Sequence, residues 1–185
     1  MDSRPALKTD PDCPGEHVVL LGADRRPIGS AAKSTVHHTA TPLHLAFSCY
    51  VFDPHGQLLV TRRSLAKRAW PGVWTNSVCG HPLPEEPAEE AVRRRAREEL
   101  GVALEDLRLL LPDYAYRATD SGGVVENEVC PVFRATTRDT PTPDPDEVAE
   151  WRWIDWAAFT TVARTAPWAI SPWAAEQIPL LDHRA

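Results

Sequence analysis

Short runs of apolar residues, separated by turn-forming residues, are spread along most of the chain. The runs are rich in β-branched and aromatic residues and are bounded on at least one side by Gly, Pro or Asp, which is typical of β-strands. The strands expected from these runs cover residues 17–24, 43–53, 57–63, 72–79 and 150–154. Two further runs, at 113–120 and 124–136, flank the turn Ser121-Gly122-Gly123 and predict a β-hairpin.

The period of the pattern changes to that of a helix after Pro87. Apolar residues then recur every fourth position near one helix face, at Ala88, Val92, Ala96 and Leu100. Pro87 suits the first turn of this helix and Gly101 its C-terminal cap. Asp155 and the pair Ser171-Pro172 predict the starts of two later helices. Strands before and after helices, together with a hairpin, predict an α+β or α/β sandwich rather than a doubly wound sheet.

The length and composition of the chain are those of one globular domain. It has 185 residues, of which 43% are hydrophobic and 25% are charged, and this is enough to bury a substantial core. Residues 1–16 lack the apolar segment of a signal peptide, and their composition predicts a disordered leader. Residues 17–185 are then expected to form a single domain.

Charge and cysteine content narrow the class of protein. The net charge of −6 disfavours a general nucleic-acid or anionic-membrane surface, so an anionic ligand must be held by a local cluster of Lys and Arg. The longest strongly apolar stretch, at 43–52, is too short to span a bilayer. The scattered cysteines Cys13, Cys49, Cys79 and Cys130 favour reduced thiols in a cytoplasmic protein. The sequence contains no G-x-G-x-x-G motif, so no flavin or nicotinamide is expected.

One segment has the spacing of a known metal-binding motif. The matching positions are Gly80, Glu86, Arg94, Glu98, Glu99 and Gly101. Carboxylates placed after a glycine-led loop can hold Mg²⁺ against phosphate oxygens, whereas the helix taken alone is also typical of an exposed helix with Arg–Glu ion pairs. With both terminal glycines present, the segment resembles the Nudix box, a loop–helix–loop that binds a divalent cation and a diphosphate. That family normally has a glutamate after the box arginine, and Arg95 at this position argues against ordinary Nudix hydrolysis.

A second set of residues predicts a separate metal site. Glu126 and Glu128 are two positions apart in an apolar predicted strand, so their side chains lie on one face about 7 Å apart. Buried carboxylates need a partner, and imidazoles from other strands can provide one. The candidates are His37, His38, His44 and His81. A mixed nitrogen and oxygen set suits Mn²⁺, Mg²⁺ or Zn²⁺, although any single histidine is more often a surface or hydrogen-bonded core residue.

Four stretches of the sequence together resemble one enzyme family. They are TRRSLAKRAWPGVWTNSVCGHP (61–82), YRATD (116–120), VVENEVCPVF (124–133) and SPW (171–173). From about His17 to Trp173 the chain is similar to the type I isopentenyl-diphosphate isomerases, divergent Nudix enzymes that interconvert isopentenyl and dimethylallyl diphosphate. The resemblance implies a Nudix-like α/β/α sandwich with a mixed β-sheet. It also implies a metal-dependent isomerase that moves protons rather than electrons.

The same resemblance implies roles for individual residues. The implied catalytic residues are Cys79, Glu128, Tyr116 and Trp173. The implied metal ligands are His37, His44, His81, Glu126 and Glu128, with Glu99 contacting the Mg²⁺ that arrives with the diphosphate. The implied diphosphate-binding residues are Lys33, Arg63, Lys67 and Arg95, so Arg95 is the expected residue at its position. The ungapped spacing from Lys33 to His44 selects His37 as the first metal ligand, and the alternative, His38, requires a one-residue deletion in the loop that follows.

Two alternatives to the isomerase remain open at the level of sequence. A Nudix-type diphosphate hydrolase uses the same fold and predicts phosphate release. A non-catalytic module that binds metal or prenyl diphosphate explains the ligands but gives Cys79 and Tyr116 no role. For the isomerase, the expected partner is a small-molecule prenyl diphosphate, with no nucleic acid and no membrane, and the protein is expected to be a monomer or weak homodimer.

Overall fold

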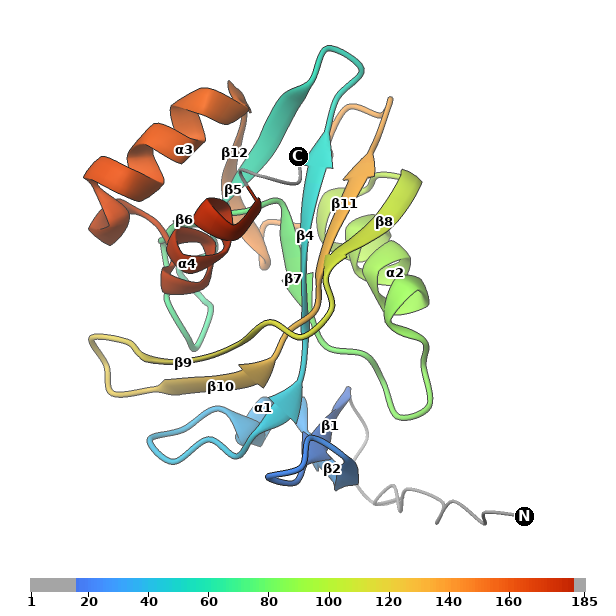
Figure 1. The fold of residues 1–185 in the computed structure, drawn as a ribbon, viewed down its shortest axis with the longest axis vertical. Helices are drawn as coiled ribbons and strands as arrows, with labels where there is room; N and C mark the ends of the chain where they lie inside the picture. Colours follow the sequence, from blue (N-terminus) through green and yellow to red (C-terminus); the bar gives the residue numbers. More distant parts are fainter. Residues whose placement is uncertain (1–15, 182–185) are drawn as a thin grey trace.

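Two mixed β-sheets form the frame of the protein, shown in Figure 1 as a computed structural model. The structure describes residues 16–181, so the predicted leader lies outside the described residues except for Glu16. The larger sheet has the strand order β12 (Val148–Asp155), β5 (Gln57–Arg63), β4 (Phe47–Phe52), β11 (Val132–Thr136) and β8 (Glu105–Leu111), with β6 (Trp74–Thr75) beside β5 and β7 (Val78–Gly80) beside β4. The smaller sheet has the order β2 (Pro27–Ala32), β1 (His17–Leu21), β3 (His44–Leu45), β10 (Val125–Val129) and β9 (Ala115–Thr119).

Helices cover both faces of the larger sheet. The helices are α1 (Lys33–Val36), α2 (Ala88–Leu100), α3 (Trp156–Thr165) and α4 (Pro172–Leu181), with a 3₁₀ turn η1 (Pro167–Ala169). Figure 1 shows α2 on one side of this sheet and α3 with α4 on the other. Strand β4 lies between them and is buried at every position, which explains why its sequence is apolar except at Ser48. The predicted α/β/α sandwich is confirmed, with two mixed sheets in place of the single one expected.

Two apolar clusters hold this sandwich together. Apolar side chains of α2, such as Val92 and Leu100, pack with Phe47 and Val51 of β4 on one face. Side chains of α3 and α4 pack with Tyr50 and other β4 and β5 residues on the opposite face. Alternate residues of one strand therefore serve two different cores, as the period of two requires.

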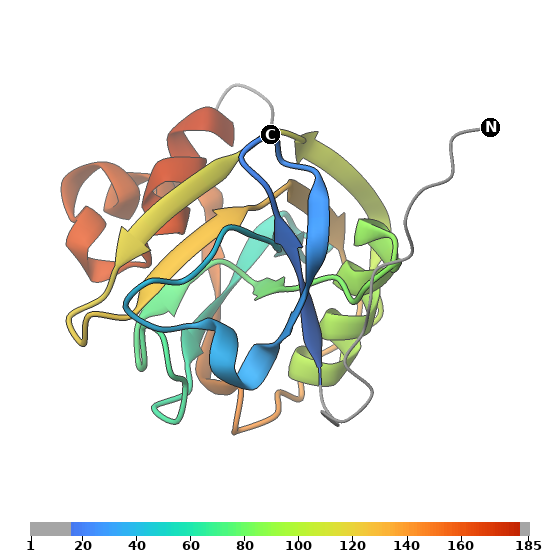
Figure 2. The same ribbon diagram turned by 90° about the horizontal axis from the view of Figure 1, so that it is seen from below.

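The smaller sheet lies at one end of the larger one, and the chain passes between them three times. Figure 2 shows this sheet from below, with β1 and β2 in front. The expected strand 43–53 divides at Ala46 into β3 and β4, and the expected strand 124–136 divides at Cys130 and Pro131 into β10 and β11. Each break carries the chain from one sheet to the other. The expected strand 72–79 also divides, into β6 and β7, and strands β2 and β8 were not predicted.

The helix that carries the Nudix-box residues begins and ends as its sequence predicts. Pro87 is the N-cap residue of α2, and Gly101 is its C-cap with a left-handed φ of 67°. A Cβ at Gly101 would lie 2.2 Å from Thr142 Oγ1, so only glycine fits this position without a shift. Asp155 occupies the N-cap of α3 without a side-chain capping bond, and Ser171 Oγ accepts the Ala174 N–H at 3.3 Å at the start of α4. No helix within residues 16–181 is long and apolar enough to cross a membrane.

Candidate active site

A cavity of about 460 Å³ is lined by residues from both sheets and from helices α1, α2 and α4. This volume is in the range of small-molecule sites. All residues that the sequence assigned to the site line this cavity, with the exception of His44. The lining residues among them are Lys33, His37, Arg63, Lys67, Cys79, His81, Arg95, Glu99, Tyr116, Glu126, Glu128 and Trp173. His44 is fully buried behind them.

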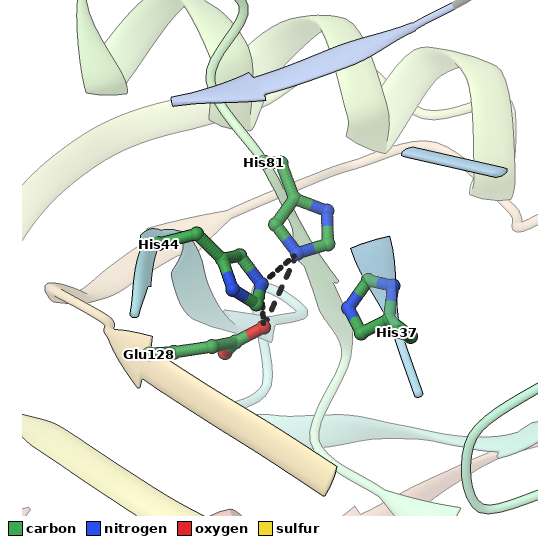
Figure 3. A group of neighbouring side chains, drawn as sticks. All are labelled: His37, His44, His81 and Glu128. Carbon is green, nitrogen blue, oxygen red and sulfur yellow. Dashed lines mark hydrogen bonds and ion pairs between the residues drawn. The ribbon is translucent and has the colours of Figure 1, made fainter. Parts of the chain in front are cut away.

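Three histidines and a glutamate converge at one side of the cavity, as Figure 3 shows. Glu128 of β10 is the register partner of His44 in the parallel strand β3, and His81 follows β7. The Nε2 atoms of His44 and His81 are 3.3 Å apart, and they lie 3.4 Å and 3.2 Å from Glu128 Oε1. With His37, one ligand atom from each residue lies within 4.8 Å of all the others.

The hydrogen bonds around these side chains leave lone pairs facing one another. His44 Nδ1 lies 2.9 Å from the carbonyl oxygen of Pro42, so Nδ1 carries the proton in the neutral ring and Nε2 presents a lone pair. His37 Nε2 and Glu126 Oε2 are 3.2 Å apart, and neither of these buried atoms has a hydrogen-bond partner within residues 16–181. Buried lone pairs that face one another are satisfied by a cation, and this nitrogen and oxygen set fits a divalent metal ion.

Burial and charge shift the pKa values within this group in opposite directions. Burial alone would raise the pKa of Glu128, but the hydrogen bonds and charges of His44 and His81 hold it well below its usual value. Burial and the nearby Glu128 charge raise the pKa of Glu126. Burial also lowers the pKa of His81 to about 3, although the hydrogen bond and the charge of Glu128 oppose this shift. Of these two carboxyl groups, Glu128 therefore has the lower pKa.

Of the two adjacent histidines, only His37 takes part in the group. His37 follows α1 and is 9% exposed, with its ring centroid 5.1 Å from that of His44. His38 is exposed, and its Nδ1 accepts the N–H of Ala40 at 3.1 Å. The structure therefore brings the residue selected by the sequence spacing, and not its neighbour, beside the other three.

Cationic side chains line the rest of the cavity, and each is held by an internal partner. Lys33 forms an ion pair with Glu16, and Lys67 forms one with Glu147. Burial lowers the pKa of Lys67 to about 8. Arg63 donates to the carbonyl oxygen of Ala69 at 2.8 Å and 3.1 Å, so its guanidinium is fixed by the loop that follows β5.

Arg95 is the most heavily bonded of these cations. Its guanidinium donates two hydrogen bonds, of 2.9 Å and 2.5 Å, to Oε1 of Glu99, which lies one turn further along α2. Arg95 is only 6% exposed. It also contacts Glu16 at 3.1 Å and Glu147 at 3.2 Å. Arg95 therefore occupies the position at which hydrolytic Nudix boxes carry a glutamate, and its guanidinium is the cation at the centre of a cluster of carboxylates.

Cys79 and Trp173 are joined by one buried amide. Asn76 Oδ1 lies 3.2 Å from Cys79 Sγ and accepts the Trp173 indole N–H at 3.0 Å. Burial raises the pKa of the Cys79 thiol to about 11, although its bonds to Ser48 and Asn76 oppose the shift. The ring of Tyr116 lies 5.8 Å from that of Trp173, and both rings are mostly buried.

Several residues at the site were not identified from the sequence. Glu16 lies in the expected leader and Glu147 precedes the last expected strand, and local composition does not reveal ion pairs with distant residues. Ser48 and Asn76 lie within the expected strands 43–53 and 72–79. Their polarity inside apolar strands was the available signal, since buried polar side chains need specific partners.

Comparison with known proteins establishes the class. A family model described as the NUDIX domain matches residues 42–181. The structure is similar to a Deinococcus radiodurans protein with a TM-score of 0.66 and 22% identity, covering 89% of this chain and 98% of that one. It is also similar to a MutT protein of Methanosarcina mazei with a TM-score of 0.60 and 17% identity, covering 77% and 94%. These two likenesses show the fold alone, and with the family model they define a Nudix-domain protein.

Sequence relatives then define the family within this class. The chain is 57% identical over 170 residues to the isopentenyl-diphosphate Delta-isomerase of Frankia alni, covering 92% of this chain and 88% of that protein. It is 59% identical over 167 residues to the protein of the same name from Mycolicibacterium vanbaalenii, covering 90% and 92%. The chain belongs to the isopentenyl-diphosphate Delta-isomerase family, and the resemblance found in its sequence is confirmed.

Proposed function

We propose that this protein isomerises isopentenyl diphosphate to dimethylallyl diphosphate by adding one proton to the carbon chain and removing another. The observation that carries the proposal is that a thiol, Cys79, and a carboxyl group, Glu128, line the same cavity as five cationic side chains. A diphosphate bound by the cations leaves its short carbon chain within a cavity that holds both proton-transfer groups.

The reaction needs an acid and a base that both reach the substrate. Moving the double bond from the 3 to the 2 position places a proton on one carbon and removes one from another. Cys79 and Glu128 are the proposed proton-transfer groups, and Tyr116, which lines the cavity near Glu128, is proposed to relay a proton. An unactivated alkene is a very weak base, so its protonation produces carbocation character. The π face of the buried Trp173 indole is proposed to stabilise that charge.

Two cation sites are part of the proposal. His37, His44, His81, Glu126 and Glu128 would hold a divalent ion such as Mn²⁺, Mg²⁺ or Zn²⁺. Glu99 would contact a Mg²⁺ that arrives with the diphosphate, beside the diphosphate ligands Lys33, Arg63, Lys67 and Arg95. When bound, these ions supply positive charge to the carboxylate and to the phosphate oxygens. No flavin or nicotinamide enters the proposal.

The Nudix-type diphosphate hydrolase is less well supported than the isomerase. Hydrolysis within this superfamily normally uses a glutamate at the position of Arg95. Here the Arg95 guanidinium is held by the carboxylate of Glu99. We further propose that the protein acts in the cytoplasm and is a monomer or weak homodimer. Light scattering of the purified protein would test the oligomeric state.

The test is an incubation of pure protein with isopentenyl diphosphate and Mg²⁺. The expected result is an acid-labile allylic diphosphate without phosphate release, and in D₂O the product should carry carbon-bound deuterium. Cys79→Ser and Glu128→Gln should each lower turnover by at least roughly 10²-fold, the lower limit of what a positioned acid or base contributes. Full activity of Cys79→Ala, or phosphate release without allylic product, would overturn the proposal.

A further inference from the structure

A chain of buried polar groups leads from the protein core to the sulfur of Cys79. Gln177 Nε2 donates to Ser48 Oγ at 3.0 Å, and Tyr50 Oη lies 3.0 Å from Gln177 Oε1. Ser48 Oγ lies 3.5 Å from Cys79 Sγ, because Ser48 of β4 is the register partner of Cys79 in β7. Ser48, Tyr50 and Gln177 are at most 1% exposed, and of these three only Ser48 lines the cavity.

The direction of the hydrogen bonds in this chain follows from the proton of Tyr50. Burial raises the pKa of Tyr50 well above its usual value, so the phenol keeps its proton. Within residues 16–181, Gln177 Oε1 is the acceptor found for that proton. A flipped Gln177 amide would leave a buried phenolic proton unpaired, at a cost of about 1–3 kcal/mol. The amide nitrogen therefore faces Ser48, and the Ser48 hydroxyl proton remains free to donate to sulfur.

The Cys79 sulfur also lies beside a hydrogen-bond acceptor, Asn76 Oδ1. Asn76 Nδ2 donates to the carbonyl oxygens of Cys49 and Val78 at 3.0 Å and 3.2 Å, which turns Asn76 Oδ1 toward Cys79 and Trp173. The thiol proton can rest on this oxygen while Ser48 donates to the sulfur. Cys79 thus has a hydrogen-bond partner both with and without its proton.

We propose that Ser48 is a positioning residue for Cys79, and that Tyr50 and Gln177 hold its hydroxyl in the orientation that serves the sulfur. The inference rests on the proposed function, since it requires Cys79 to exchange a proton with the substrate. A hydrogen bond to a charged acceptor is stronger than one to a neutral acceptor. Ser48 therefore stabilises Cys79 most when its proton has left, and it contributes to turnover without binding the diphosphate.

The test is a double-mutant cycle on turnover. Ser48→Ala should lower kcat by about tenfold and leave KM unchanged. A tenfold loss is the lower limit expected for removing a hydrogen bond to a charged group. Tyr50→Phe, which removes one oxygen far from the substrate, should lower kcat by roughly threefold because Gln177 is no longer held in one orientation. In the Ser48→Ala background, Tyr50→Phe should have no further effect on kcat. If the two variants instead damaged the structure independently, their losses in kcat would be additive.

Cys130 provides the matched control, because Ser48 Oγ also lies 3.4 Å from its sulfur. Cys130→Ala should keep the wild-type kcat, and the Ser48→Ala effect should persist in that background. Wild-type kcat in Ser48→Ala, additive effects of the two variants, or loss of the Ser48→Ala effect in Cys130→Ala would each overturn the inference while leaving the isomerase intact. A wild-type protein without isomerase activity would instead refute the proposed function, and this inference with it.

Discussion

Replacing Arg95 with methionine tests whether the acidic cluster at the cavity depends on one cation. Arg95 is 6% exposed and Glu99 is 7% exposed, and two hydrogen bonds of 2.9 Å and 2.5 Å join them across one turn of α2. Glu16 and Glu147 contact the same guanidinium at 3.1 Å and 3.2 Å. Arg95→Met keeps an apolar stem but leaves buried Glu99 without its partner.

The expected loss of stability is large. Removing one partner of a buried ion pair costs about 3–5 kcal/mol, because the remaining charge is desolvated and unpaired. For a domain of this size each kcal/mol lowers Tm by about 2–4 °C, so Arg95→Met should unfold about 6–20 °C below the wild type. Replacing both partners, as Arg95→Met with Glu99→Leu, should recover much of this loss, since an apolar pair of similar volume is often neutral.

Thermal unfolding followed by circular dichroism at neutral pH measures the effect. Arg97→Met is the matched control, because Arg97 is exposed on the same helix and a surface change there should stay within about 0.5 kcal/mol. If Arg95→Met unfolds within about 2 °C of Arg97→Met, or if the double variant is less stable than the single one, the cluster does not depend on Arg95 in the way described.

Three further changes have defined outcomes. Ion pairs lower the pKa of Glu16 from 4.5 to about 2 despite burial, so the stability that its carboxylate adds is complete above pH 4.5 and is lost as the pH falls toward 2. In urea unfolding, the difference in unfolding free energy between wild type and Glu16→Gln should therefore shrink over that pH range. A constant difference contradicts this. Gly101→Ala should destabilise more than Gly56→Ala in the same assay, because both have positive φ but only Gly101 has an atom 2.2 Å from the added Cβ. His81→Ala should lower bound metal measured by mass spectrometry while His38→Ala should not, and strong chelation should abolish turnover of the wild type.

The sequence predicted those parts of the fold in which local pattern and packing agree. Strand β5 and helix α2 were found almost to the residue, because their ends carry Gly and Pro signals. Strands β2 and β8 were missed, since they are edge strands with mostly exposed or half-buried residues, and β2 also lacks an apolar run. The breaks at Ala46 and Cys130 were missed for another reason: the residues remain apolar there while the chain changes sheet.

The candidate site was predicted mainly from motif strings and from spacing within one strand. Two-residue spacing placed Glu126 and Glu128 on one face, and the structure has both beside the histidines. Local spacing could not reveal Glu16 or Glu147, whose partners are up to 80 residues away in the sequence. Such pairs depend on which loops the fold brings to the cavity, and no short-range pattern encodes that.

The cysteines show why residue type alone does not define a reactive group. Cys49 and Cys79 are almost neighbours across the β4–β7 ladder, yet their side chains point to opposite faces of the sheet. Cys49 is fully buried against α2 and its pKa is strongly raised by burial. Cys79 lines the cavity, where Ser48 and Asn76 oppose the effect of burial. A one-residue shift in this register would exchange the two environments, so the position of the thiol depends on the pairing of Ser48 with Cys79.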